Sequence, residues 1–142
     1  MMEKTPLEFV NELKNAAVIT AYNLTHPHIV ATNKEHEKMT GYKNMELVGR
    51  HPRLFQGDLT LRAKEIKESL IKTDTWEGTI VNYTKCGRPY SVSVVITPCM
   101  IGGVKFYCAL KIRKHFIDKN TARKVNVCKN QCLIMLSALK SI

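Results

Sequence analysis

The sequence lacks the features of several classes of protein. No apolar run approaches the roughly 20 residues that span a bilayer. The amino terminus lacks the cationic and apolar succession of a signal peptide. A chain of 142 residues is about one domain's worth of polypeptide. We therefore expect one intracellular domain, located in the cytoplasm.

Residue patterns for metal binding and catalysis are also missing. The sequence has no phosphate-binding Gly-x-x-x-x-Gly-Lys loop, no His-Glu-x-x-His, no Gly-x-Ser-x-Gly and no Gly-rich dinucleotide turn. Its cysteines are odd in number and form no Cys-x-x-Cys pair: Cys86, Cys99, Cys108, Cys128 and Cys132. We therefore expect free thiols, no metal site and no catalytic residues, so an enzyme is the least supported class.

Acidic residues are few, with 12 Asp and Glu against 22 Lys and Arg, which gives a net charge of +10. The excess is concentrated in residues 111–129, which contain seven Lys and Arg and one acidic residue, Asp118. A clustered positive field suits an acidic protein, anionic lipid or nucleic acid, and it also suits a solvated linker. Because no recognised nucleic-acid motif accompanies the charge, a basic nucleic-acid-binding module remains an alternative that rests on charge alone.

The amino-terminal segment predicts a helix followed by a hairpin. Thr5 can cap free amides, proline suits the first turn and Glu8 completes a capping box, so we expect a helix over residues 6–14. Residues 16–21 and 28–32 are rich in β-branched side chains and are separated by a polar turn, which predicts two strands.

Several helices are expected next. Residues 33–39 suit a polar helix, and Asn44 suits the cap of a short helix over 45–48. His36 stands between two glutamates, so we expect it at the solvated surface. Residues 62–71 carry apolar side chains at intervals of three and four, which predicts a helix laid across a sheet.

The following pattern changes to strands. Residues 78–83, 89–97 and 104–112 are rich in Val, Ile, Thr and Tyr, with turns at 86–87 and 102–103. Together with the first hairpin they predict a five-stranded antiparallel sheet with small helices on one face, an α+β fold.

The carboxyl-terminal segment carries apolar residues at alternating intervals of three and four: Val125, Cys128, Cys132, Met135, Leu139 and Ile142. This stripe is too short to define a coiled coil. A helix docked on its own sheet and a seam between two chains both remain open. We divide the chain into a flanking helix at 1–15, a core at 16–114, and a basic linker with an amphipathic helix at 115–142.

Three segments carry a family resemblance: Gly49–Gly57 (GRHPRLFQG), Trp76–Gly78 and Asn82–Gly87. Together they resemble the PAS domain family, and the resemblance covers roughly residues 16–114. It implies the five-stranded PAS fold and a regulatory or sensory module. It also implies a protein partner or a homodimer, contacted through the sheet face and the terminal helices.

The segments also resemble the flavin-binding LOV branch of that family. The resemblance places Arg53 where an arginine contacts the flavin phosphate, and it places Gln56 and Asn82 at polar contacts to the cofactor. Four positions depart from the pattern: an asparagine is replaced by His51, the reactive cysteine by Pro52, and the strand glutamine at the flavin's reactive edge by Lys111, and Val92 falls near the position of a second ring-binding asparagine. The resemblance therefore argues against LOV photochemistry, and it leaves no cofactor, FMN or FAD as the options.

Each of these residues also has a purely structural interpretation. Asn82 can bond across the sheet, Gln56 can cap a loop, and Arg53 can pair with Asp58 or Glu77. Trp76 suits a packing anchor because a tryptophan buries a large apolar area. Since a buried ammonium without a partner is costly, Lys111 must point outward, bind an anion or lose its proton.

Overall fold

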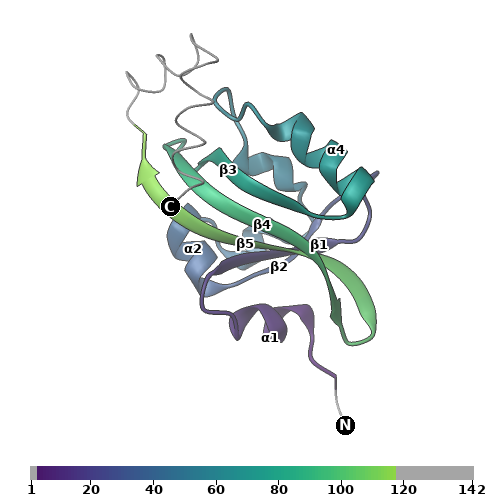
Figure 1. Ribbon diagram of the computed structural model, residues 1–142. Helices are drawn as coiled ribbons and strands as arrows, with labels where there is room; N and C mark the ends of the chain where they lie inside the picture. The colour runs from purple at the N-terminus through teal and green to yellow at the C-terminus, as the bar shows by residue number, and fades with distance from the viewer. Residues whose placement is uncertain (1–2, 118–142) are drawn as a thin grey trace.

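Five antiparallel strands form one sheet in the order β2-β1-β5-β4-β3 (Figure 1). The computed structural model describes residues 3–117. The strands are β1 (Ala16–Ala21), β2 (Ile29–Thr32), β3 (Trp76–Tyr83), β4 (Pro89–Ile101) and β5 (Val104–Phe116). The helices are α1 (Pro6–Asn11), α2 (Lys34–Thr40), α3 (Asn44–Leu47), the 3-10 helix η1 (Pro52–Phe55) and α4 (Ala63–Thr73). The expected α+β class and five-stranded sheet are confirmed.

The β4–β5 hairpin is longer than the sequence predicts. Its two-residue turn consists of Gly102 and Gly103, with φ of 56° and 75°, the left-handed region that a tight hairpin turn of this kind requires. Strand pairing continues to this turn, with Cys99 opposite Phe106. At the other end β5 reaches Phe116, beyond the core boundary expected at residue 114. Strand length is thus set by the pairing partner rather than by the local pattern.

Helix α1 has the expected capping box, in which the Thr5 hydroxyl accepts from the Glu8 amide. It ends at Asn11, and the prediction that it runs to Lys14 is wrong. The Asn33 side-chain amide donates to the carbonyls of Val10 and Asn15. The Val10 carbonyl accepts from this side chain and from the Leu13 amide, which closes the last turn before the chain enters β1.

Two expectations about the short helices are also corrected. Asn44 is the first residue of α3 rather than its cap, and its side-chain oxygen accepts from the Thr32 amide at 2.8 Å, which ties β2 to α3. His36 was expected at the surface, but it has no solvent exposure. His36 shares one face of α2 with Thr40 and with the cap residue Asn33, which are also buried, and this face packs against the sheet.

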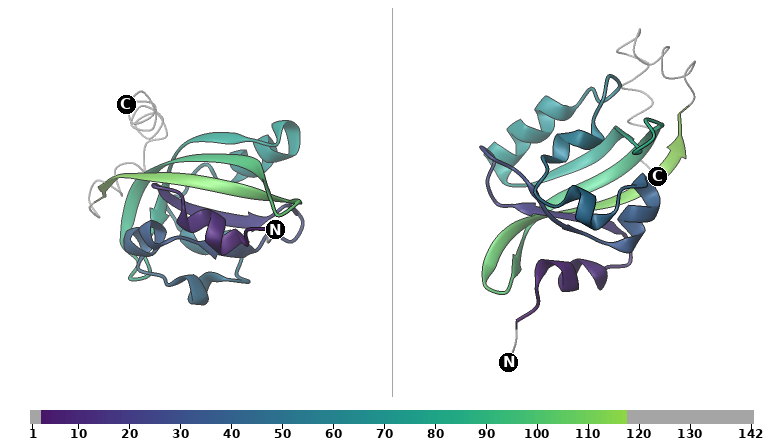
Figure 2. Two further views of the ribbon diagram at one scale, coloured as in Figure 1. Left: turned by 90° about the horizontal axis from the view of Figure 1, so that it is seen from below. Right: turned by 180° about the vertical axis from the view of Figure 1, so that it is seen from behind.

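The two faces of the sheet hold different cores. In β1, Val18 packs against α3 and η1. Its neighbours Ala17 and Ile19 point the other way, into a cluster with Val10 of α1. Figure 2 shows α2, α3, η1 and α4 gathered on one side of the sheet, which we call the inner face. Because side chains alternate along a strand, one set of side chains packs on the inner face and the other set packs against α1.

The predicted seam at 125–142 and most of the basic linker lie outside the described residues, and so do two of the five cysteines. Cys86, Cys99 and Cys108 are free thiols. Within residues 3–117, no helix is long and apolar enough to cross a bilayer.

Candidate ligand-binding site

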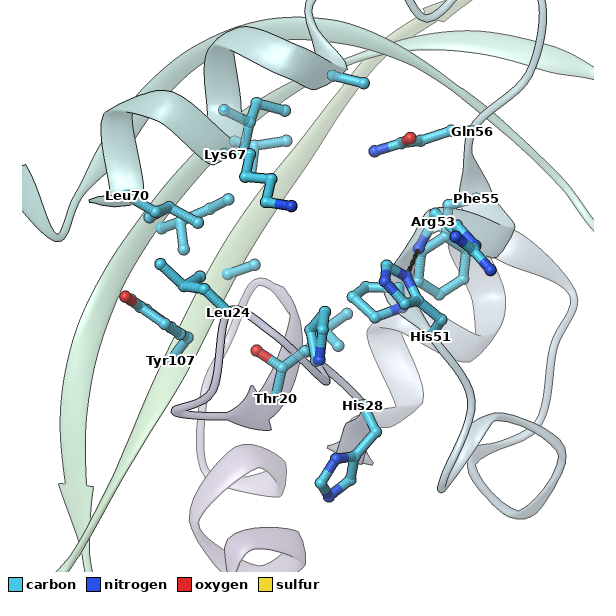
Figure 3. A pocket seen from close by; sticks show the side chains of 18 of the residues that line it. Thr20, Leu24, His28, His51, Arg53, Phe55, Gln56, Lys67, Leu70 and Tyr107 are labelled. Carbon is cyan, nitrogen blue, oxygen red and sulfur yellow. Dashed lines mark hydrogen bonds between the residues drawn. The ribbon is translucent and has the colours of Figure 1, made fainter. Parts of the chain in front are cut away.

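The inner face of the sheet and its helices enclose a cavity of about 920 Å³, which we call the inner cavity (Figure 3). This volume lies at the upper end of the range of about 300–1,000 Å³ that holds small-molecule ligands. Its walls come from strands β1, β3, β4 and β5, from η1 and α4, and from the loop at 24–28. The interior of the fold is therefore not filled by side chains alone.

Most of the inner cavity wall is apolar. The sheet contributes one residue in two along neighbouring strands: Val18, Ile80, Val94, Ile96 and Ala109. Helix α4 adds Ile66 and Leu70 from the apolar stripe that the sequence predicted. Such a surface favours a ligand with a large apolar or aromatic part, since its burial removes that area from water.

Six of the positions that the LOV resemblance singled out line the inner cavity: His51, Pro52, Arg53, Gln56, Asn82 and Lys111. Four of them come from the segment around η1. The ring Nδ1 of His51 accepts from the Arg53 amide at 3.0 Å, and Pro52 occupies the first position of the 3-10 helix. Arg53 and Gln56 of this capped turn both line the cavity, and Figure 3 shows the Gln56 amide reaching into the open space.

Lys111 lies in the wall contributed by β5 and is 5% exposed. Its Nζ lies 3.3 Å from Nε2 of His36 and 3.4 Å from Oδ1 of Asn82. It also lies 4.1 Å from the centre of the Phe55 ring. Burial lowers the pKa of Lys111 from 10.5 to about 7, because the ammonium form loses its hydration. Of the three options open from the sequence, the geometry matches the loss of the proton.

His36 and Asn82 complete this buried group. Burial, and then the nearby Lys111, hold the pKa of His36 well below its ordinary 6.5, so the ring is neutral. Its Nδ1 atom has no hydrogen-bond partner among the described residues. The Asn82 amide donates to the Val81 carbonyl at 3.2 Å, and its oxygen faces Lys111 two strands away. Asn82 therefore makes the cross-sheet contact that its structural interpretation requires.

The outer part of the inner cavity is basic. Arg53, Lys64 and Lys67 line it with exposed side chains, and so do His26 and His28 of the 24–28 loop. Figure 3 shows the amine end of Lys67 of α4 pointing into the open space of the cavity. None of the described residues that line the cavity is Asp or Glu.

The pKa of His51 reflects its partial burial and the excess of basic side chains at this opening. Partial burial, followed by the positive charges of Arg53 and Lys67, lowers the pKa of His51. The ion pairs found in the described chain do not join Arg53 to Asp58 or Glu77, the partners considered from the sequence. The opening therefore favours an anionic group.

Sequence reasoning missed several lining residues. Lys67 follows Ile66 in α4 and lies beside the apolar stripe of the helix. Its position next to the cavity could therefore have been predicted from the helical period. Tyr107 also lines the inner cavity from β5. It lies four residues before Lys111, so the alternation of the strand places both side chains on the same face. Its hydroxyl donates to Asp74, the left-handed cap of α4. This last contact joins segments 33 residues apart and leaves no local signal.

Trp76 is a packing anchor, as expected. It is 5% exposed, belongs to a cluster with Ile80 and Val94, and does not line the inner cavity. The Arg62 guanidinium lies 5.4 Å from the centre of its ring. Among residues 3–117 no group of His, Cys, Asp and Glu side chains has the geometry to hold a metal ion.

The fold is similar to solved structures of light-sensing domains. The LOV domain from the Erythrobacter litoralis EL346 blue-light activated histidine kinase superposes with a TM-score of 0.65 at 20% identity, covering 72% of this chain and 98% of that one. A LOV protein of Rhodobacter sphaeroides superposes with a TM-score of 0.64 at 18% identity, covering 73% and 61%. At these identities the likeness concerns the fold alone.

Sequence comparison finds curated relatives. The chain is 25% identical over 115 residues to the nitrogen fixation regulatory protein of Klebsiella oxytoca, covering 78% of this chain and 23% of that protein. It is 33% identical over 85 residues to the Arabidopsis thaliana protein TWIN LOV 1, covering 58% and 21%. The chain thus spans less than a quarter of the length of either relative. Residues 15–111 match the PAS domain family, which is more than half of the chain. The chain therefore belongs to the PAS domain family of sensory and regulatory modules.

Proposed function

We propose that this PAS domain senses a small ligand of the flavin-nucleotide class, FMN or FAD, held without a covalent bond in the inner cavity. The observation that carries the proposal is a cavity of about 920 Å³ with apolar walls, a basic opening and no acidic lining residue in the described chain. The domain acts as a regulatory sensor and not as an enzyme.

The chemistry of the lining residues fits such a ligand. The apolar residues of β3, β4 and β5 suit an aromatic ring system, and the amides of Gln56 and Asn82 offer donors and acceptors for its polar edge. At the opening, Arg53 and Lys67 suit a phosphate, since a guanidinium and an ammonium bind phosphate oxygens through charge-assisted hydrogen bonds. A bound flavin would supply light absorption and reversible electron uptake.

Light sensing through a thiol adduct is not part of this proposal. No cysteine is among the residues that line the inner cavity in the described chain, and Pro52 lines it at the position where the resemblance places the reactive cysteine. We expect a flavin here to respond to redox state, or to light without a bond to sulfur.

We propose that the signal leaves through the sheet to a protein partner or a second copy of the chain. β1 and β5 line the inner cavity with one set of side chains and pack against α1 with the alternate set. A ligand shifts the packing equilibrium only by its differential affinity for two arrangements. The terminal segments, including residues 125–142, would carry the contact to the partner.

The test is an absorption spectrum of the purified full chain, followed by titration with FMN, FAD and haem. We expect a flavin spectrum or saturable binding of FMN, and about tenfold or greater loss of FMN affinity in Arg53→Ala and Lys67→Ala. Riboflavin, which lacks the phosphate, should be insensitive to both substitutions. Lys72→Ala is the matched control, because Lys72 is an exposed lysine of α4 that does not line the inner cavity. A colourless protein that binds none of the three compounds would contradict the proposal.

A further inference from the structure

The buried lysine of the inner cavity has no acidic partner. The Nζ atom of Lys111 contacts His36 and Asn82, and it faces the Phe55 ring. Neither contact supplies a negative charge, and no described lining residue is acidic. A lysine at 5% exposure without a counter-ion is unlike a structural lysine, which keeps its ammonium in water or in an ion pair.

None of the groups described next to Lys111 carries a negative charge. Its neighbour on α2 is the neutral His36, its neighbour on β3 is the amide of Asn82, and η1 contributes the Phe55 ring. The adjacent strands β1 and β4 place Ala16 and Val94 beside it. The ionisable groups elsewhere in the cavity are basic: His26, His28, His51, Arg53, Lys64 and Lys67. Burial lowers the pKa of Lys111 to about 7, so near neutral pH much of this amine keeps its lone pair.

An uncharged amine in a cavity is a nucleophile toward carbonyl groups, provided the cavity admits the carbonyl compound. The inner cavity has the volume for one, and Lys111 is part of its wall. Lys67 and Arg53 at the opening are exposed and favour an anion there. The two ends of the cavity therefore select different groups of one molecule, a carbonyl at the buried end and an anion at the open end.

We propose that Nζ of Lys111 is a covalent attachment site for an aldehyde that also carries a phosphate or carboxylate, joined as a Schiff base. The lone pair of Nζ attacks the carbonyl carbon and forms a carbinolamine. The two hydrogens of the amine then leave with the carbonyl oxygen as water, and a C=N bond remains. The step is a condensation and needs neither oxidant nor reductant. The neutral imine also removes the need to bury an ammonium.

The test uses pyridoxal 5′-phosphate as the probe, since it carries an aldehyde and a phosphate. The full chain is treated near pH 7 with probe at roughly equimolar amount, reduced with borohydride, and examined by intact mass and peptide mapping. We expect one adduct per chain, located at Lys111. Lys111→Met should abolish it, whereas Lys85→Met, which removes an exposed lysine, should leave it unchanged.

Two further readouts do not depend on the Lys111 variant folding. Pyridoxal without the phosphate should need about tenfold or more probe for the same labelling, because the charge-assisted bonds at the opening are lost. The labelling rate at Lys111 should level off above about pH 7, while the rate at exposed lysines should keep rising toward their ordinary pKa of about 10.4. Adducts spread over exposed lysines with Lys111 unmodified in the wild-type chain would overturn the proposal.

This inference goes beyond the flavin proposal and does not rest on it. FMN binding without an adduct at Lys111 would contradict the covalent site alone. An adduct at Lys111 in a chain that ignores FMN and FAD would support the covalent site and contradict the flavin alone.

Discussion

At the scale of single residues, the unusual feature is a pair of basic side chains buried together. Lys111 and His36 are 75 positions apart in the chain, yet their side-chain nitrogens lie 3.3 Å from each other. Neither keeps its ordinary pKa, because each loses hydration on folding and neither has a described acid beside it. Their protonation is therefore coupled to folding.

Lys111 makes stability depend on pH in the alkaline range. Its pKa falls from 10.5 when unfolded to about 7 when folded, so between these values only the unfolded state holds the proton. Wild-type stability should rise with pH across this window, by up to about 1.4 kcal/mol for each pH unit, relative to Lys111→Met. Urea unfolding of both proteins at several pH values from about 7 to 10 measures the difference. A constant difference would show that Lys111 stays charged in the folded state.

His36 has an effect of the same sign in the acidic range. Its folded pKa lies well below 6.5, so as the pH falls through 6.5 only the unfolded state takes up a proton, and stability is lost. We expect His36→Phe to gain stability relative to the wild type as the pH falls from about 7 to 5. The substitution also removes the unpartnered Nδ1 atom. His28→Phe, at an exposed histidine, should track the wild type over the same range; a matching gain there would refute the assignment to His36.

At the scale of elements, one asparagine organises the entry into the sheet. Asn33 is 2% exposed, and its oxygen accepts from the amides of Ala17 and His36, both at 3.0 Å. Its nitrogen donates to the carbonyls of Val10 and Asn15. A single side chain thus caps α2 and joins it to α1 and β1.

Asn33→Ala should therefore be strongly destabilising. It leaves four backbone groups without this partner, and we expect a loss of at least about 3 kcal/mol in the free energy of unfolding. Asn23→Ala is the matched control, because the Asn23 side chain also accepts from two amides but is exposed to water. Its cost should stay below about 1 kcal/mol. Equal denaturation midpoints for the two variants would contradict the role given to Asn33.

At the scale of the whole molecule, the inner cavity and α1 lie on opposite faces of the same strands. Val18 lines the cavity while Ile19, the next residue, packs in the cluster with Val10 of α1. Tyr107 and Cys108 of β5 divide in the same way. A movement of a strand residue that lines the cavity therefore acts directly on the next residue, which packs on the opposite face.

Ligand binding should accordingly reach α1. Saturation with FMN at 100 times its dissociation constant would stabilise the folded chain by about 2.7 kcal/mol. We expect amide hydrogen exchange to change in α1 as well as in β1 and β5, measured by mass spectrometry on the full chain. The exposed turn at 84–88 is the internal reference and should not change. Protection confined to β3, β4 and the cavity loops would contradict transmission through the sheet.

The sequence determined the local elements because their causes are local. The capping box at Thr5, the glycines of the β4–β5 turn and the alternation along the strands each act over a few residues. The motif around Arg53 and Gln56 belongs to this class, since both residues lie on one capped 3-10 turn that lines the cavity. The helices and strands were therefore predictable, and the motif residues that line the cavity were identified through the PAS resemblance.

Only the tertiary structure decided the chemistry of the inner cavity. His36 between two glutamates looks like a surface residue until α2 packs on the sheet, and Lys111 could face outward, bind an anion or lose its proton until β5 takes its place beside β1 and β4. Burial and the distance between side chains far apart in the chain set the pKa of each group, and neither quantity is local. The fold follows from short-range pattern, whereas the state of its buried amine follows from which segments meet.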